Sequence, residues 1–255
     1  IVDASFVDQK LAKPSQSEII GAVQAATDPR DVLVGAAGSL PGDLHKLWRV
    51  RDPLGYHMEY AFSCMGYEIA AGLGVARADS SRTPVVMMGD GSYLMMHTEL
   101  VTAVAERLKF IVVLVQNHGY ASIGHLSEDI GSQRFGTKYR FRDAKSNNHE
   151  SGDVLPVDLA TNAESLGMNV IQIAESSSAL ADLSAAMKVA KAHPTATLIH
   201  INSDPLLYAP GGEAWWEVPI PEVSTLESTK KAYENYKEAR KVQKKYLGKG
   251  TSERK

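Results

Sequence analysis

The chain has 255 residues, of which 44% are hydrophobic and 22% charged, with a formal net charge of −3. These values are ordinary for a globular protein of one large α/β domain, or at most two small ones, and the charge gives no indication of a nucleic-acid partner. Cys64 is the single cysteine, which excludes an intramolecular disulfide and a metal site built from cysteines.

The sequence also lacks signals that would direct the chain to a membrane. No apolar run reaches the roughly 18 residues that a membrane span needs, and the first residues lack the basic and apolar regions of a secretory signal. We therefore expect a cytoplasmic protein without membrane contact. Because residue 1 is Ile rather than Met, we also expect the sequence to be a piece of a longer chain.

The predicted elements alternate between short apolar runs and segments of helical periodicity. Strands are predicted at 31–37, 84–89, 110–117, 169–174 and 196–202, and helices at 15–26, 63–76, 93–107, 157–166 and 177–192. The strands are nearly continuous in apolar residues, as strands are when both faces of a sheet are covered. The alternation predicts an α/β fold, with a doubly wound, mainly parallel sheet and helices on both faces.

Two regions fall outside this alternation. The segment 122–152 is rich in glycine and charge and has no sustained periodicity, so we predict a long loop that closes over a site. We place one domain at 1–220, followed by a basic helix and tail at 221–255, with the helix at 225–247. The tail holds ten Lys or Arg and five Asp or Glu from Glu222 onward, a pattern more typical of a solvated helix than of a polyanion site.

Polar residues follow the second and third predicted strands. Asp90, in a Gly-Asp-Gly turn, follows 84–89, and Asn117 ends 110–117. The carboxyl ends of parallel strands lie at one edge of a sheet, where such sheets bind ligands. A carboxylate and an amide oxygen suit Mg²⁺ or Ca²⁺, and phosphate oxygens commonly complete a Mg²⁺ site. The pattern favours a metal–diphosphate site over the alternative of an ordinary turn and a local cap.

These two turns resemble the thiamine-diphosphate motif, in which Gly-Asp-Gly is followed after some 25–30 residues by Asn; here 25 residues separate the turn from Asn117. The resemblance implies thiamine diphosphate as cofactor and a Mg²⁺ bound by the Asp90 carboxylate, the Asn117 side-chain oxygen and the main-chain carbonyl of Gly119. Many relatives have a second Asn where this chain has His118. Gly91 lets the backbone approach a phosphate closely, and Ser92 can donate its hydroxyl where the helix begins. Tyr120 and Ala121 are also predicted to contact the cofactor.

Two upstream segments resemble other parts of the same pocket. "FSCMGYEIAAGLGVA" (62–76) is similar to the segment that opens the cofactor pocket in the acetolactate synthase and pyruvate decarboxylase superfamily. There the residue matching Met65 wedges between the cofactor rings, and the carbonyl matching Ser63 accepts a hydrogen bond from the aminopyrimidine; simple core packing is the alternative for Met65. "AAGSLPGDLH" (36–45) resembles the first diphosphate loop, with Gly38, Ser39 and Leu40 near the phosphates.

A narrower resemblance points to a reaction. "LWRVRDPLGYHMEYAFSCMGYEIAAGLGVA" and "GDGSYLMMHTEL" resemble the trihydroxycyclohexane-1,2-dione hydrolases, ring-opening enzymes of inositol catabolism, over roughly 15–217. This implies the C-terminal pyrophosphate-binding domain of a homodimeric or homotetrameric enzyme that hydrolyses a carbon–carbon bond in a polyhydroxylated cyclic diketone. It also implies that the pyrimidine-binding and central domains are absent here, and with them the glutamate that activates the cofactor, so that we expect this chain alone to be inactive.

Among the histidines near these motifs, His118 and His125 are the candidates for substrate contact, although any one of them is more often structural. Two other interpretations remain open. One is a carboligase or decarboxylase similar to acetolactate synthase, and the other is a non-catalytic domain that keeps the fold for assembly.

Overall fold

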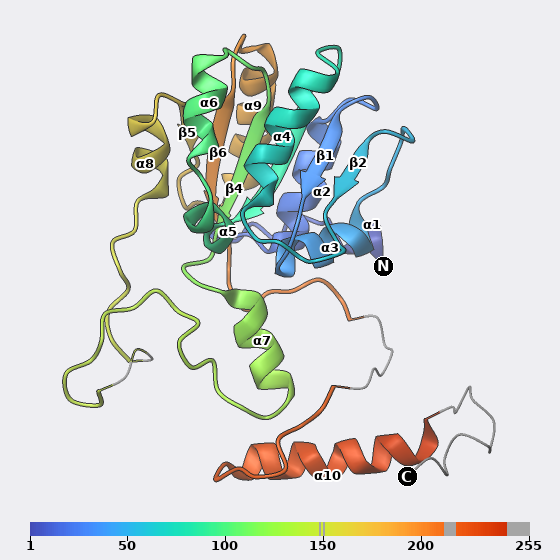
Figure 1. Ribbon diagram of the computed structural model, residues 1–255, viewed down its shortest axis with the longest axis vertical. Coiled ribbons are helices and arrows are strands. Elements are labelled where there is room, and N and C mark those ends of the chain that lie inside the picture. The colour runs from blue at the N-terminus through green and yellow to red at the C-terminus, as the bar shows by residue number, and fades with distance from the viewer. Residues whose placement is uncertain (148, 150, 212–217, 244–255) are drawn as a thin grey trace. The chain divides into compact units, whose positions relative to one another are not determined.

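A computed structural model describes residues 1–147, 149, 151–211 and 218–243. The chain divides into two compact units (Figure 1). The first comprises residues 1–123 and 135–210 and contains the sheet; the second comprises residues 124–134 and 211–255. The second unit thus joins the C-terminal residues to part of the segment predicted as a loop, and the predicted domain boundary at 220 stays a prediction.

The first unit is built on one six-stranded sheet in the order β2-β1-β3-β4-β6-β5, in which every neighbouring pair is parallel. This confirms the predicted fold class. The strands are β1 (Val32–Gly35), β2 (Tyr56–Met58), β3 (Pro84–Gly89), β4 (Ile111–Gln116), β5 (Asn169–Gln172) and β6 (Thr197–Asn202). The five predicted strands are all present. The edge strand β2 escaped prediction because its three half-buried residues form no apolar run.

Helices cover both faces of this sheet (Figure 1). On one face lie α2 (Gln16–Ala26), α3 (Ser39–Leu47) and α9 (Ala179–Ala192); on the other lie α4 (Tyr67–Ala78), α5 (Asp90–Met95), α6 (Glu99–Ala105) and α8 (Leu159–Ser165). Side chains of β3 alternate between the two cores, with Met87 in the first and Val86 and Met88 in the second. A Cβ at Gly72 would lie 2.4 Å from Val86, so α4 packs against β3 with backbone rather than side chain.

Two predicted helices have different bounds in the structure. The helix predicted at 63–76 begins only at Tyr67, because Ser63 (φ 50°) and Gly66 (φ 94°) both have left-handed backbone conformations. The helix predicted at 93–107 is two helices, α5 and α6. The chain leaves helical geometry at Met96, and the His97 ring Nδ1 is 3.1 Å from the Tyr93 carbonyl at the end of α5. Apolar periodicity continues through this break, which is why the sequence pattern conceals it.

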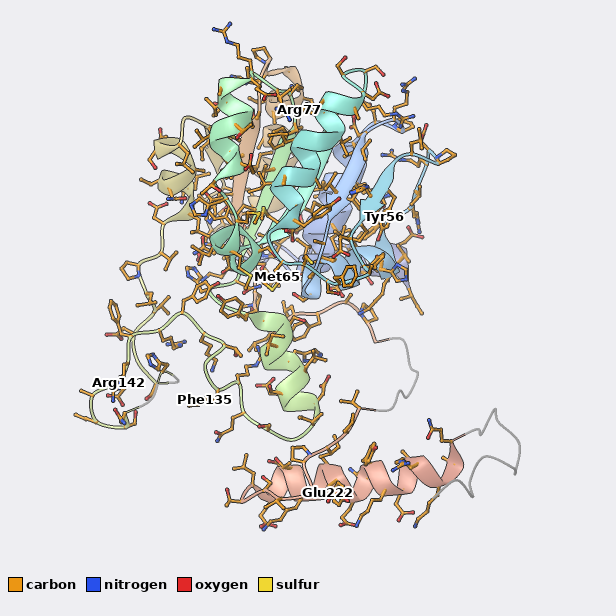
Figure 2. All side chains as sticks on the ribbon, viewed as in Figure 1. Tyr56, Met65, Arg77, Phe135, Arg142 and Glu222 are labelled. Atoms are coloured by element: carbon orange, nitrogen blue, oxygen red, sulfur yellow. The ribbon has the colours of Figure 1, made fainter. Side chains whose placement is uncertain are left out.

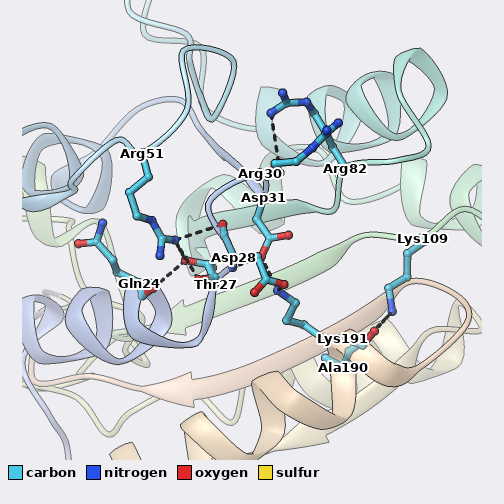
Figure 3. A network of polar contacts seen from close by, with 10 residues as sticks. All are labelled: Gln24, Thr27, Asp28, Arg30, Asp31, Arg51, Arg82, Lys109, Ala190 and Lys191. Atoms are coloured by element: carbon cyan, nitrogen blue, oxygen red, sulfur yellow. Dashed lines mark hydrogen bonds and ion pairs between the residues drawn. The ribbon is translucent and has the colours of Figure 1, made fainter.

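Charged side chains form a paired network at the amino-terminal edge of the sheet (Figure 3). Lys191, at the end of α9, forms ion pairs with Asp28 and Asp31, just before β1. Lys109, just before β4, donates to carbonyls at the end of α9, including those of Ala190 and Lys191. A positive charge is favoured at the carboxyl end of a helix. The network thus fastens α9 to the starts of two strands.

In the second unit, α10 (Glu227–Val242) packs on the segment 124–134. The Gly131 carbonyl accepts hydrogen bonds from Ser228 Oγ (2.6 Å) and Thr229 Oγ1 (2.8 Å). A Cβ at Gly131 would lie 2.5 Å from the Ser228 carbonyl oxygen, and its φ is 78°, so this contact requires glycine. The helix predicted at 225–247 is confirmed within these bounds, and residues from 244 on lie outside the described part of the chain.

Part of the predicted loop is helical. Helix α7 (Ala121–Asp129) occupies the start of the segment 122–152 and runs into the second unit. Among the described residues between α7 and α8 there is no further helix or strand; Lys138 forms an isolated bridge with Gly119, and Arg140 forms one with Val154. None of the helices in the described ranges combines the length and apolar character that crossing a membrane requires.

Candidate functional site

The predicted site residues come from loops at the carboxyl-terminal edge of the sheet. Asp90 follows β3 directly, Asn117 follows β4, and Gly38 begins α3 three residues after β1. Figure 2 shows Met65 at this end of the sheet, whereas Arg77, at the far end of α4, lies at the opposite end. The strand order β1-β3-β4 makes the three loops neighbours. The sheet topology thus brings together segments far apart in the sequence.

Asp90 is a buried carboxylate, with 1% of its surface exposed. Burial raises its pKa to about 6, against the opposing effect of backbone N–H groups from Gly119, Gly91 and other nearby residues. The Gly91 amide donates to Oδ1 (3.0 Å) and the Gly119 amide to Oδ2 (3.2 Å). Its raised pKa shows that these donors leave the charge under-compensated. The carboxylate is therefore suited to a cation, which would favour the charged form.

Asn117 supplies a second oxygen at this edge. Its Oδ1 is buried and has no hydrogen-bond partner in the part of the chain that the structure describes. An acceptor buried in this state costs free energy unless a donor or a cation satisfies it. The next residue, His118, has φ 58°, a left-handed turn that histidine adopts more readily than most residues, and this turn presents the Gly119 amide to Asp90.

These oxygens fit a hard divalent cation. In the described ranges no group of three or more His, Cys, Asp or Glu side chains could hold a metal. A set of one carboxylate, one amide oxygen and one main-chain carbonyl is a different kind of site, which suits Mg²⁺ when a phosphorylated ligand completes the coordination. The amide of Gly119 contacts the Asp90 carboxylate and the backbone of Asn117 lies beside it, so the residues present fit Mg²⁺, and the metal site itself stays a prediction.

Two side chains pack closely around the backbone at Gly91 and leave little space for a side chain there. A Cβ at Gly91 would lie 2.9 Å from the Tyr120 ring and 3.1 Å from Met65 Cε. The predicted cofactor residues Gly91, Tyr120 and Met65 thus converge, although they come from three different loops. Ser92, buried in α5, and Ala121, at the start of α7, adjoin them in the sequence. Glycine here lets the Tyr120 ring and Met65 pack directly against the backbone.

Glu59 and Glu68 hold the turn that carries Met65. The Glu59 carboxylate accepts hydrogen bonds from the amides of Phe62 (2.9 Å) and Cys64 (2.8 Å). Glu68 is fully buried in the first turn of α4 and accepts from the Gly66 amide at 2.8 Å. Burial raises the pKa of Glu68, while Ser92 and Gly66 are among the groups that lower it. Both carboxylates therefore fix the loop 59–66 in place, with Ser63 exposed and strained at positive φ.

The loop after β1 provides a helix N-terminus. Gly38 is the N-cap of α3, has φ 109°, and has open space where a Cβ would be. Ser39 begins the helix, and its Oγ donates to Gln16 Oε1 at 3.2 Å. The Leu40 side chain is buried in the core. Exposed amides at a helix N-terminus favour a phosphate, which agrees with the expectation for this loop.

The two candidate histidines lie in different surroundings. His118 is half-buried beside Asn117, and burial, together with Lys13, lowers its pKa. His125 lies on α7 in the second unit, where its Nε2 is 3.6 Å from the Asp129 carboxylate. Tyr139, which the sequence did not single out, packs its ring edge-on to Tyr120, and burial raises the pKa of its hydroxyl.

Sequence reasoning also missed a polar cluster next to His118. His200, on β6, has 4% of its surface exposed, and its Nε2 is 2.6 Å from Gln116 Oε1 on β4. Gln116 Nε2 is in turn 3.2 Å from His118 Nδ1. The sequence does contain a signal for this cluster, because polar residues stand in two apolar runs: His200 interrupts "TLIHIN" and Gln116 ends "IVVLVQ". Buried polar residues in such strands need a partner or a role.

Comparisons with known proteins agree with this geometry. Residues 36–201 match the family model of the thiamine pyrophosphate enzyme, C-terminal TPP binding domain. The chain is 39% identical over 230 residues to 3D-(3,5/4)-trihydroxycyclohexane-1,2-dione hydrolase 2 of Bacillus cereus, and likewise 39% identical to a hydrolase of that name in Bacillus anthracis. In each case the match covers 90% of this chain and 35% of the relative. The chain thus spans about a third of the length of the curated relatives it matches.

Solved structures give the same fold. A thiamine diphosphate-dependent 4-hydroxybenzoylformate decarboxylase of Rhodococcus jostii superposes with a TM-score of 0.62 at 19% identity, covering 76% of this chain and 33% of the other. A benzoylformate decarboxylase of Polynucleobacter necessarius gives 0.60 at 19% identity, covering 74% of this chain and 33% of the other. Since the family model matches well over half of the chain, the chain belongs to the family of C-terminal thiamine pyrophosphate-binding domains of thiamine pyrophosphate enzymes.

Proposed function

We propose that this chain holds the diphosphate of thiamine diphosphate through Mg²⁺, as one domain of an enzyme that hydrolyses a carbon–carbon bond in a polyhydroxylated cyclic 1,2-diketone. The observation that carries the metal–diphosphate part is the pairing of the buried Asp90 carboxylate with the unpartnered Asn117 oxygen at neighbouring strand ends. The reaction is supported by the similarity to trihydroxycyclohexane-1,2-dione hydrolases 39% identical to the chain.

The residues have separate tasks in this proposal. Asp90, Asn117 and the Gly119 carbonyl bind the cation, and the amides at the start of α3, beside the open position at Gly38, donate to the diphosphate, which Gly91 also adjoins. Met65, Ser63, Tyr120 and the neighbouring Ala121 and Ser92 enclose the rings. The bound cofactor supplies carbanion chemistry at its thiazolium carbon. The chain's own residues position the cofactor and exclude water from it.

Part of the catalytic machinery is expected to lie in other domains of the full-length enzyme. The carboxylates nearest the cofactor segments, Glu59 and Glu68, are engaged with backbone amides of the loop 59–66. We therefore assign the group that activates the cofactor to a pyrimidine-binding domain in another part of a homodimeric or homotetrameric enzyme. His118 and His125 are the candidates for substrate contact. The 255-residue chain alone is expected to bind the cofactor weakly and to be inactive.

Two assays on the full-length protein test the reaction. Turnover of a trihydroxycyclohexane-1,2-dione that requires thiamine diphosphate and Mg²⁺ is the expected result. Carboligation or decarboxylation of pyruvate without hydrolysis of the dione would favour the acetolactate synthase-like alternative. The absence of both activities in a protein that binds neither cofactor nor metal would favour an assembly domain. Turnover of the dione by the isolated chain would contradict the assignment of the activating group to another domain.

A further inference from the structure

A short segment between α7 and α8 returns to the turn that follows β4. Residues 137–139, which we call the strap, run antiparallel to residues 118–120. Gly119 faces Lys138 in this pairing. All of these residues belong to the first unit. The strap thus lies against the turn from which the proposed metal ligands Asn117 and Gly119 come.

Two hydrogen bonds join the strap to the turn, one on each side of Gly119. The Tyr120 amide donates to the Thr137 carbonyl at 2.8 Å. The Tyr139 amide donates to the His118 carbonyl at 2.9 Å. The strap therefore engages the backbone groups that flank Gly119 and not those of Gly119 itself.

This pattern fixes the direction of the Gly119 backbone. When a residue of an antiparallel pair is flanked by such bonds, its own N–H and C=O both point away from the partner segment. The Gly119 N–H accordingly reaches Asp90 Oδ2 at 3.2 Å, on the side opposite the strap. The Gly119 carbonyl points to that side as well. The pairing thus directs toward Asp90 the carbonyl that the proposed metal site requires.

The strap approaches Gly119 too closely to admit a side chain there. A Cβ at Gly119 would collide with the Thr137 carbonyl oxygen and lie 3.1 Å from Lys138 Cα. Both are backbone atoms, so a side chain at this position could be accommodated only if the strap moved. Glycine at position 119 is therefore a requirement of the pairing.

The residues that lead into α8 hold the strap from its other side. The Leu155 amide donates to the Tyr139 carbonyl at 2.9 Å, and the Phe141 amide donates to the Asp153 carbonyl at 2.8 Å. The strap is thus anchored independently of the turn after β4, so it can impose its geometry on that turn.

Tyr139 also connects the strap to the turn after β3. Its ring packs edge-on against the Tyr120 ring, with the centroids 5.5 Å apart. The Tyr120 ring in turn packs against the backbone at Gly91, where a Cβ would lie 2.9 Å from it. The Tyr139 hydroxyl is buried without a hydrogen-bond partner in the described part of the chain. Its contacts to the two turns therefore come from its ring and its amide.

We propose that the strap positions the metal-binding turn and that Tyr139 is the positioning residue, because its amide sets the direction of the Gly119 carbonyl. Tyr139 does not itself touch the cation. The inference rests on the proposed metal–diphosphate site, to which it adds a residue from outside the two turns. Its ring has the lesser task of holding Tyr120 against Gly91.

Calorimetric titration of thiamine diphosphate into the full-length protein, with and without Mg²⁺, tests this role in three variants. Tyr139→Phe retains the ring and the amide and should bind as the unaltered protein does. Tyr139→Pro lacks the amide hydrogen and should weaken binding in the presence of Mg²⁺ about tenfold. Tyr139→Ala keeps the amide but loses the ring, so its affinity should lie between these two. Without Mg²⁺, Tyr139→Pro and Tyr139→Ala should bind alike, since no cation is present for the carbonyl to meet.

Hydrogen exchange of the cofactor-free protein reports the pairing itself. The Tyr120 amide should be protected in the unaltered protein and in Tyr139→Phe, and should exchange at least about tenfold faster in Tyr139→Pro. If Tyr139→Pro fails to fold, Gly119→Ala replaces it, because the added methyl group displaces the strap and leaves every amide in place. Gly74→Ala is its matched control, since a Cβ at Gly74 meets nothing within 4 Å.

The outcomes separate this inference from the proposed function. Mg²⁺-dependent affinity that is as high in Tyr139→Pro or Gly119→Ala as in the unaltered protein would overturn the role of the strap and leave the metal site standing. An unprotected Tyr120 amide in the unaltered protein would do the same. Absence of Mg²⁺-dependent binding in the unaltered protein would contradict the metal site, and this inference with it.

Discussion

The two edges of the sheet treat buried polar groups in opposite ways. At the amino-terminal edge, Lys191 is paired with Asp31, and Arg82 donates to both oxygens of Asp52 at 2.9 and 3.2 Å. At the carboxyl-terminal edge, the oxygens of Asn117 and Asn202 are buried without a partner in the described part of the chain. Such groups need a partner that the described residues do not supply, such as a water molecule, an ion or a ligand. The amino-terminal edge therefore serves stability, and the carboxyl-terminal edge serves binding.

Asp90→Asn should have the largest effect on binding. Losing the carboxylate should weaken Mg²⁺-dependent binding of thiamine diphosphate about 100-fold, since hydrogen bonds and ion contacts of a charged group contribute most. Asn169→Ala, at the other end of the sheet, should leave this affinity unchanged. Calorimetric titration of thiamine diphosphate with Mg²⁺ measures the affinity of each variant. Equal affinity in Asp90→Asn and the unaltered protein would remove Asp90 from the metal site.

The same substitution should stabilise the cofactor-free protein at high pH. Burial raises the pKa of Asp90 to about 6 from 3.8, so the folded state holds its proton more tightly than the unfolded state does. The stabilisation that the protonated Asp90 gives to the folded state is therefore fully present below pH 3.8. It is lost as the pH rises through about 6. The advantage of Asp90→Asn in thermal unfolding should grow from pH 4 to pH 8. A difference in unfolding temperature between Asp90→Asn and the unaltered protein that stays constant from pH 4 to pH 8 would contradict this prediction.

Lys191→Met tests the amino-terminal edge. It leaves the buried Asp31 carboxylate without its ion pair, and we expect a loss of about 1–2 kcal/mol in the free energy of unfolding. Cofactor affinity should not change, because the site lies at the other edge. Urea unfolding and calorimetry measure the two quantities. A loss of cofactor affinity as large as that of Asp90→Asn would show that the edges are not separate in function.

Gly91→Ala tests the close packing of Tyr120 and Met65 against the backbone at Gly91. The added methyl group would lie 2.9 Å from the Tyr120 ring, so the ring or the loop must move. We expect cofactor affinity to fall about tenfold, with a stability loss of about 1 kcal/mol. Gly74→Ala is the control, since a Cβ there meets nothing within 4 Å and helical Ala is favoured over Gly. A normal affinity in Gly91→Ala would show that close approach at this position is not needed.

Arg77→Ala should have the smallest effect. Arg77 pairs with Glu106, but the two side chains are 51% and 37% exposed, and exposed ion pairs contribute about 0–1 kcal/mol. Neither unfolding nor cofactor binding should change measurably. If Arg77→Ala lost more stability than Lys191→Met, the exposed ion pair would contribute more than the buried one, which would contradict the prediction.

The sequence predicted the parts of the molecule whose signal is local. Buried parallel strands appear as apolar runs, and Asp90 and Asn117 follow two of them, so the sheet and the pairing of these residues were both accessible. The break between α5 and α6 was not, because it depends on His97 and on the Gly66 turn, which contact α5 only in the folded chain. The bonds of Glu59 and Glu68 to the loop 59–66 also could not be read from spacing. His200 and Gln116 were visible as polar residues in apolar runs, but their contact requires the register of β4 and β6.

The direct test of the central claim is calorimetric titration of thiamine diphosphate into the full-length protein with and without Mg²⁺, repeated with Asn117→Ala. Asn117 contributes the unpartnered oxygen, so its removal should weaken binding in the presence of Mg²⁺ and have little effect in its absence. That difference would show that the cation joins the carboxyl-terminal edge to the diphosphate. Binding that is equally tight with and without Mg²⁺, or unchanged in Asn117→Ala, would contradict the account.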